Sequence, residues 1–183
     1  MEPILIGIIV GSDSDLKSQC LSGLQILRDD EKAAVVAVIT ASIHRNTEEV
    51  LEFLRNYALQ AGVFIIGAGW ANHLTGFCEA YLRNVLRSTA PIIGVAFTDE
   101  SSQTDEERVR HGQASRLSIT EVPGTQVIWR DDLGQFVGSY GFKRACKLAA
   151  KGQFPAIVLQ EPKLTHNRTL VEALEFIKKE REV

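Results

Sequence analysis

A chain of 183 residues that is 45% hydrophobic and 23% charged is long enough and apolar enough for one globular domain with its own core. Its formal net charge of -3 lacks the basic excess of nucleic-acid-binding proteins, so no nucleic-acid partner is expected. The N-terminal apolar run is short and follows Glu2, which favours neither a signal peptide nor a membrane span. Cys20, Cys78 and Cys146 fall in helical patterns without metal-ligand spacing. We expect buried thiols in a reducing cytoplasm and no metal.

The first predicted element is a strand over residues 4–10, whose apolar and β-branched run is typical of a strand buried on both faces of a parallel sheet. Gly11 then lets the backbone bend tightly or approach a ligand. Ser12, Ser14 and Asp15 supply hydroxyls, a carboxylate and a cap for the helix that follows. The apolar face of that helix contains Leu16, Cys20, Leu24 and Leu27. The turn is therefore either an ordinary capped turn or an anion-binding site at a helix N-terminus.

Further apolar runs, separated by helical patterns, predict three more strands over residues 33–39, 63–66 and 91–95. This alternation indicates an α/β domain with a central parallel sheet and right-handed crossovers, which we interpret as a three-layer flavodoxin-like fold. After the second strand, Asn46 and Glu49 predict a capping box for the next helix. The second and third strands end in loops over residues 40–45 and 67–76.

The second half of the chain is less regular. Residues 98–112 are charged and almost without apolar residues, which predicts a solvated loop insertion, partly helical or mobile, with a mobile surface loop favoured over a lid. Three later elements are a core segment over residues 117–122, a fifth short strand around 127–129 and a helix over 142–150. We expect residues 155–183 to form a C-terminal helical extension of the single domain 1–183, with Thr169 and Glu172 as a second capping box.

The loops after the first three strands should meet, because ligands of parallel sheets bind outside the carboxyl ends of the strands. Arg45 beside Ser42 suits a phosphate, since a planar guanidinium can hold two oxygens at once. Asp15 suits a ribose hydroxyl. His44 can move a proton, because an imidazole titrates near neutral pH. The set predicts a site for a phosphorylated ribonucleoside on which a histidine acts.

Structural roles remain open for the aromatic and histidine residues. His44 is either a loop histidine or a site residue, and the same choice applies to His73. Trp70 and Trp129 fit a core or a subunit interface as well as a site. We expect two further histidines in charged surroundings, His111 and His166, to be solvated.

Three motifs carry a resemblance to a known family. They are Gly11-Ser12-Asp13-Ser14-Asp15, Ser42-Ile43-His44-Arg45 and Gly67-Ala68-Gly69-Trp70-Ala71-Asn72-His73-Leu74-Thr75-Gly76. Together they resemble the signatures of the N5-carboxyaminoimidazole ribonucleotide mutase family, the small carboxylase-like enzymes of purine synthesis. A weaker match follows at residues 118–124, and the resemblance covers roughly residues 4–150.

The resemblance implies a role for each matching residue. Ser12, Asp15 and Arg45 correspond to the residues that bind the ribonucleotide, and Ser42 to a further phosphate contact. His44 corresponds to the acid/base histidine, while Gly69 and His73 correspond to positions around the transferred carboxyl group.

The family chemistry implies an isomerase that converts N5-carboxyaminoimidazole ribonucleotide to 4-carboxy-5-aminoimidazole ribonucleotide, with a phosphorylated aminoimidazole ribonucleotide and CO2 as its partners. The N-carboxy group leaves as CO2, and the nucleophilic ring carbon recaptures it without any cofactor. Family members form octamers, so a homo-oligomer is expected.

The chain also departs from the family pattern. The family has Gly where this chain has Trp70, Ala where it has Asn72, Pro where it has Thr75, and normally Ala where it has Ile43. Trp70 either points away from the site or reshapes it. Two alternatives to the mutase therefore stay open: a related carboxylase or decarboxylase, which uses free CO2 or another ribonucleotide, and a nucleotide-binding relative without catalysis.

Overall fold

The computed structural model describes residues 2–98 and 102–181. Four parallel strands form the central sheet in the order β2-β1-β3-β4. They are β1 (Ile4–Val10), β2 (Ala33–Thr40), β3 (Val63–Ala68) and β4 (Ile92–Ala96). The four predicted strands are confirmed, with small shifts at their ends. Every residue of β3 and β4 is buried, as expected for strands covered by helices on both faces of the sheet.

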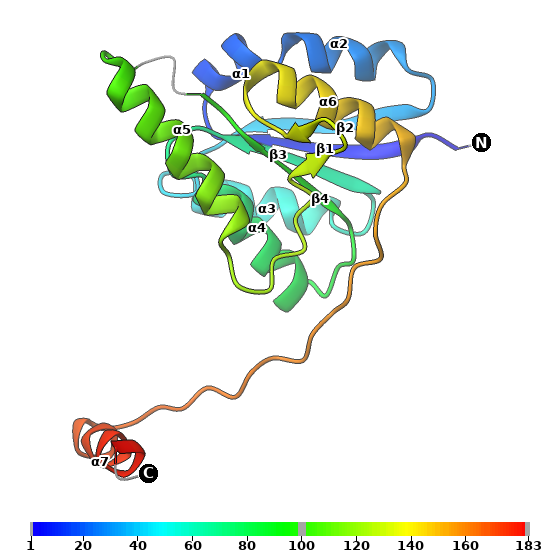
Figure 1. Cartoon of the computed structure of the whole chain (residues 1–183). Coiled ribbons are helices and arrows are strands. Elements are labelled where there is room, and N and C mark those ends of the chain that lie inside the picture. Colours follow the sequence, from blue (N-terminus) through cyan, green and yellow to red (C-terminus); the bar gives the residue numbers. More distant parts are fainter. Residues whose placement is uncertain (1, 99–101, 182–183) are drawn as a thin grey trace.

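Helices cover both faces of the sheet (Figure 1). The helices packed on one face are α1 (Asp13–Gln19), α2 (Leu21–Asp29) and α6 (Gly138–Lys151). Those on the other face are α3 (Thr47–Tyr57), α4 (His73–Asn84) and α5 (Asp105–Thr120). Two separate apolar clusters result, one on each side of the sheet. The predicted three-layer flavodoxin-like fold with a central parallel sheet is thereby confirmed.

The first predicted helix is in fact two helices. The chain bends at Cys20, which ends α1 and begins α2, so the apolar face continues across the bend. Cys20, Cys78 and Cys146 are all buried, as predicted. Burial, together with the nearby Asp15 carboxylate, raises the pKa of the Cys20 thiol to about 12. Burial also raises the pKa of the other two thiols, so all three are poor nucleophiles.

The mobile surface loop favoured over residues 98–112 is wrong for residues 105–112, which form the first half of α5, as the partly helical alternative allowed. Residues 99–101 lie outside the described residues. Thr104 caps the helix through its hydroxyl, and the acidic first turn suits the positive end of the helix dipole. The buried side of α5 contains Ser115 and Ile119. The charged residues therefore mark the outer face of a packed helix rather than a loop.

The fifth predicted strand is also wrong in form. Ile128 makes only an isolated parallel bridge to Ile93, and a short hairpin of β5 (Arg130–Asp131) and β6 (Gly134–Gln135) follows. α6 begins at Gly138, four residues before the predicted start at residue 142. A Cβ on Gly141 would lie 2.5 Å from the backbone of Phe136, so glycine permits this close approach inside the helix.

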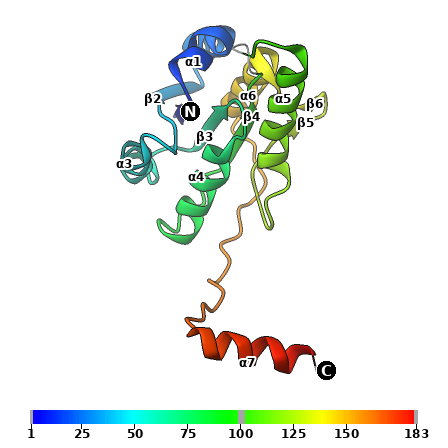
Figure 2. The ribbon, with the colours of Figure 1, turned by 90° about the vertical axis from the view of Figure 1, so that its left-hand side faces the viewer.

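The C-terminal segment contains helix α7 (Leu170–Arg181), and residues 153–169 form no helix or strand. Figures 1 and 2 both show α7 away from the rest of the chain, at the end of an extended segment. The second capping box is confirmed, because Glu172 Oε2 accepts a bond from the Thr169 amide at 2.7 Å. Among the described residues, no helix is long and apolar enough to cross a membrane.

Candidate active site

A pocket of about 400 Å³ opens at the carboxyl edge of the sheet. Val10 pairs with Thr40 on β2 and with Gly67 on β3, so the three loops begin at the same level. The pocket is lined by Gly11, Ser12, Ser14, Asp15, Ser42, Ile43, His44, Arg45, Ala68, Gly69, Trp70, Ala71, His73 and Leu74. The structure thus brings together every residue predicted for the site: Ser12, Asp15, Ser42, His44, Arg45, Gly69 and His73.

The β1 loop is held by its own side chains. Ser12 Oγ accepts a bond from the Asp15 amide at 3.1 Å and donates to Asp15 Oδ2 at 2.9 Å, which confirms Ser12 as the cap of α1. Ser14 Oγ lies 2.8 Å from Ser12 Oγ. A Cβ on Gly11 would lie 2.8 Å from Ala68 Cβ, so glycine lets this loop approach the end of β3. The Asp15 carboxylate is thereby fixed beside the pocket.

The β2 loop presents Ser42, His44 and Arg45 to the pocket. The predicted capping box at Asn46 is wrong, because its side chain makes no cap bond to α3. Instead, Asn46 Oδ1 accepts a bond from the Ser42 amide at 3.3 Å, which ties the loop to itself. The side chains of His44 and Arg45 are exposed and available to a ligand. We name Ser12, Asp15, Ser42 and Arg45 the pocket floor.

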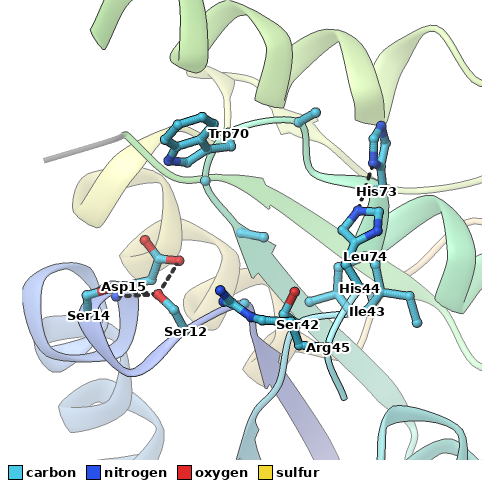
Figure 3. A pocket seen from close by; sticks show the side chains of 14 residues that line it. Ser12, Ser14, Asp15, Ser42, Ile43, His44, Arg45, Trp70, His73 and Leu74 are labelled. Carbon is cyan, nitrogen blue, oxygen red and sulfur yellow. Dashed lines mark hydrogen bonds between the residues drawn. The ribbon is translucent and has the colours of Figure 1, made fainter. Parts of the chain in front are cut away.

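The β3 loop places a second histidine against the first. His44 Nε2 lies 3.1 Å from His73 Nδ1, and the two rings meet edge to face (Figure 3). Because one of these nitrogens must carry the shared proton, the His73 tautomer sets the His44 tautomer. Asn72 orients this loop by accepting bonds from the Thr75 amide and hydroxyl and donating to the Val95 carbonyl. Asn72 and Thr75 are both fully buried, so this departure from the family pattern is a structural cap.

Trp70 also belongs to the β3 loop and lines the pocket. Its backbone φ of 53° lies in the left-handed region, which costs a residue with a side chain about 1–2 kcal/mol. The indole stacks on His111 of α5, with ring centroids 3.7 Å apart and an interplanar angle of 21°. His111 is buried, so the expectation that it is solvated is wrong. We name Trp70 and His111 the aromatic wall.

No sequence signal marks His111 as a neighbour of the site, since it lies in a charged run and reaches Trp70 only because α5 packs beside the β3 loop. Its position follows from the anchoring of that helix: Ser115 Oγ donates to the Ala68 carbonyl at 2.9 Å, directly below the β3 loop. His166 is exposed in the C-terminal segment, as predicted. Trp129 packs, partly buried, against the core.

The charges of the pocket favour a ligand with an anionic end and hydroxyl groups. Arg45 is the only lysine or arginine among the described residues that line it, and Asp15 is the only carboxylate among them. Serine hydroxyls lie beside both. Among the described residues, no group of three or more histidine, cysteine or acidic side chains could hold a metal ion.

Comparison with known proteins identifies the family. The model of the family described as AIR carboxylase matches residues 5–126. The N5-carboxyaminoimidazole ribonucleotide mutase of Synechocystis sp. is 34% identical over 122 residues, which cover 66% of this chain and 59% of that protein. The protein of the same name from Pyrococcus abyssi is 34% identical over 120 residues, covering 64% of this chain and 59% of its own.

A solved structure supports the fold alone. The crystal structure of Treponema denticola PurE covers 98% of each chain with a TM-score of 0.54 and 15% sequence identity.

The chain spans about 59% of the length of the curated relatives named above. The matched segment contains β1 from its second residue onward, β2 to β4 and all three loops of the pocket. The chain therefore belongs to the AIR carboxylase family.

Proposed function

We propose that this chain is an isomerase of purine synthesis, which converts N5-carboxyaminoimidazole ribonucleotide to 4-carboxy-5-aminoimidazole ribonucleotide. One observation carries the proposal: the pocket floor and the His44–His73 pair, which come from three separate motifs, line a single pocket. The same pocket contains groups suited to a phosphate, to a ribose hydroxyl and to a mobile proton. The names of the relatives agree with this chemistry.

The pocket floor would hold the ribose phosphate end of the substrate. Figure 3 shows the Arg45 side chain extending toward Ser12 from the Ser42 side. A guanidinium flanked by two hydroxyls can give a phosphate several charge-assisted bonds. The Asp15 carboxylate, fixed by Ser12, accepts a bond from a ribose hydroxyl. Binding this end leaves the heterocycle near the histidines.

The reaction balances without a cofactor. The bond between the exocyclic nitrogen and the carboxyl carbon breaks, which releases CO2 and leaves an electron pair that takes up a proton. The ring carbon then forms a bond to CO2 and loses its own proton. His44 can deliver the first proton and accept the second, and its contact with His73 orients the imidazole for both steps. Gly69 leaves space beside the pocket for the small CO2 molecule.

A carboxylase or decarboxylase that exchanges CO2 with solution would use the same floor and the same histidine. The departure at Trp70 favours this second candidate, because a large side chain in the loop beside Gly69 changes how CO2 is enclosed. Product analysis with labelled bicarbonate distinguishes the two: only the second candidate incorporates label in proportion to the free CO2.

We also propose that the active form is a cytoplasmic homo-oligomer, an octamer as in the family. α7 supports this proposal, since it exposes apolar side chains that a further subunit could cover: Leu170, Val171, Leu174, Phe176 and Ile177. Light scattering should give a mass of eight chains, and a monomeric mass would contradict it.

The interconversion of the two carboxylated nucleotides, followed by ultraviolet absorbance, tests the function. The native protein should be active, and His44→Asn should lower turnover by about 10²–10⁴-fold while leaving nucleotide binding close to native. His166→Asn, in the exposed C-terminal segment, is the matched control and should keep full activity. Native activity that survives His44→Asn would overturn the mechanism. Nucleotide binding without any native activity would favour the non-catalytic relative.

A further inference from the structure

The backbone of Trp70 in the aromatic wall is strained, and the contacts of this residue within the protein explain the strain only in part. Trp70 holds a left-handed backbone conformation that glycine would adopt freely. Trp70 nevertheless remains 58% exposed, so the conformation does not serve to bury this residue in the core. A large aromatic residue that is strained and exposed in the lining of a pocket points to contact with a ligand.

One face of the indole is already covered. The His111 ring stacks on it at 3.7 Å and is itself buried between α5 and the loops. α5 is anchored to the end of β3 by the bond from Ser115 to Ala68, and Ser102 Oγ lies 3.1 Å from His111 Nδ1. The imidazole is therefore held in place, and it supports the indole from behind. Only the opposite face of Trp70 is open to a stacking partner.

The space inside the pocket lies between the aromatic wall and the His44–His73 pair. In Figure 3, Trp70 and the His44–His73 pair stand on opposite sides of the pocket, and Arg45 lies below the space between them. A ligand anchored by its phosphate at Arg45 would extend upward into this space. The part that reaches it would meet the indole on one side and His44 on the other.

We propose that the open face of Trp70 stacks on the planar heterocycle of the bound ribonucleotide, and that Trp70 thereby determines specificity for a base-bearing sugar phosphate over the sugar phosphate alone. His111 acts as a positioning residue, because it holds the indole flat. The inference rests on the proposed function, since it requires the phosphate end at the pocket floor. It adds a contact to the heterocycle, for which a glycine at this position has no side chain.

The tryptophan content of the chain allows a direct test. The sequence contains two tryptophans, so Trp129→Phe leaves Trp70 as the single indole fluorophore. Titration of this variant with aminoimidazole ribonucleotide should quench the Trp70 emission, because a stacked heterocycle contacts the indole. Ribose 5-phosphate should bind to the same floor without quenching. Calorimetry measures the binding of both ligands independently of fluorescence.

Substitutions then separate stacking from folding. Trp70→Gly, which relieves the backbone strain, should raise the dissociation constant of the aminoimidazole ribonucleotide about 10-fold. The same variant should change that of ribose 5-phosphate less than about 2-fold. Trp70→Phe should restore most of the affinity. His111→Ala should weaken the quenching, and His111→Phe, which can still stack, should restore it.

The outcomes distinguish this inference from the proposed function. Nucleotide binding without quenching, or equal nucleotide affinity in Trp70→Gly and the native protein, would overturn the stacking role and leave the function standing. Tighter binding or higher turnover in Trp70→Gly would also overturn it, since the indole would then obstruct the site. If neither the nucleotide nor ribose 5-phosphate binds the native protein, the proposed function and the inference fail together.

Discussion

The pocket floor and Trp70 of the aromatic wall line the same cavity, but floor and wall are built in different ways. Floor residues make local contacts: Ser12 and Asp15 bond to each other, and the Ser42 amide donates to Asn46 Oδ1. The wall depends on a contact between the β3 loop and α5, which lie far apart in the sequence. The floor offers groups that any ribose phosphate can use. The wall offers a flat aromatic surface on which only the planar heterocycle of a ligand can stack. Specificity for the heterocycle therefore depends on the region that tertiary contacts build.

The largest effect should come from the floor. Arg45→Ala removes the only arginine or lysine among the described lining residues. Since a charge-assisted bond contributes about 1.5–3 kcal/mol, the dissociation constants of the aminoimidazole ribonucleotide and of ribose 5-phosphate should both rise about 10- to 100-fold. Calorimetry measures both, and Arg28→Ala, in an exposed ion pair on α2, is the control. A loss confined to the nucleotide would break the distinction between floor and wall.

The second largest effect should come from Asn72, the buried cap in the β3 loop that carries Trp70. Asn72→Ala leaves the Thr75 amide and the Val95 carbonyl without their buried partner. The free energy of unfolding should fall by about 2 kcal/mol, read from the urea midpoint. Asn56→Ala, on the exposed side of α3, should change it by a few tenths of a kcal/mol at most. An equal midpoint for both variants would mean that the loop is held by other contacts.

The cap of the floor loop should matter less. Ser12→Ala removes the side-chain cap of α1, which should lower the free energy of unfolding by about 1 kcal/mol. Ser18→Ala is the control on the same helix, because the Ser18 hydroxyl donates to the Ser14 carbonyl within that helix. Because Asp15 loses its hydroxyl partner, Ser12→Ala should also weaken binding of both phosphorylated ligands. Unchanged binding would remove Ser12 from the floor.

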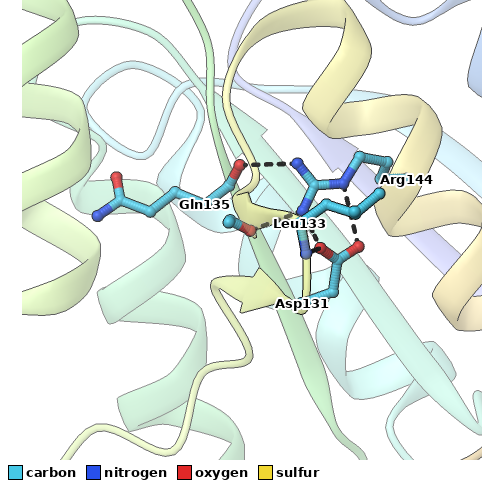
Figure 4. Close-up of polar contacts among 5 residues, drawn as sticks. Asp131, Leu133, Gln135 and Arg144 are labelled. Atoms are coloured by element: carbon cyan, nitrogen blue, oxygen red, sulfur yellow. Dashed lines mark hydrogen bonds and ion pairs between the residues drawn. The ribbon is translucent and has the colours of Figure 1, made fainter.

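A change outside both regions should affect stability alone. Asp131 accepts bonds from Arg144, whose Nε lies 3.0 Å from Asp131 Oδ2, and this guanidinium lowers the pKa of the carboxyl (Figure 4). The stabilisation is therefore present above the ordinary pKa of aspartate and is lost as the pH falls through the lowered pKa.

The unfolding free energies of the native protein and Asp131→Asn should accordingly differ at neutral pH and converge in acid, with ligand affinity unchanged. Urea titrations at several pH values check this difference. The exposed neighbour Asp132 gives the control, Asp132→Asn. A difference that persists below the lowered pKa would show that the charge of Asp131 is not responsible.

The features that could be predicted from the sequence are those that local residue patterns determine. The strand β1, its turn and the cap at Ser12 follow from an apolar run followed by polar residues within one short segment. The extent of α5 was missed because its outward-facing charges hide a buried side formed by His111, Ser115 and Ile119. The cap predicted at Asn46 was wrong because an asparagine side-chain oxygen can accept a bond either from the helix that follows or from the preceding loop. Here it accepts the bond from the Ser42 amide. The Trp70–His111 stack could not be predicted, since it depends on where α5 packs.

The structure of the protein with aminoimidazole ribonucleotide bound tests the central claim most directly. We predict the phosphate within hydrogen-bond distance of Arg45 and a floor serine, and a ribose hydroxyl at Asp15. The heterocycle should lie between the indole of Trp70 and His44. A nucleotide bound elsewhere, or bound here with its phosphate away from Arg45, would contradict the account.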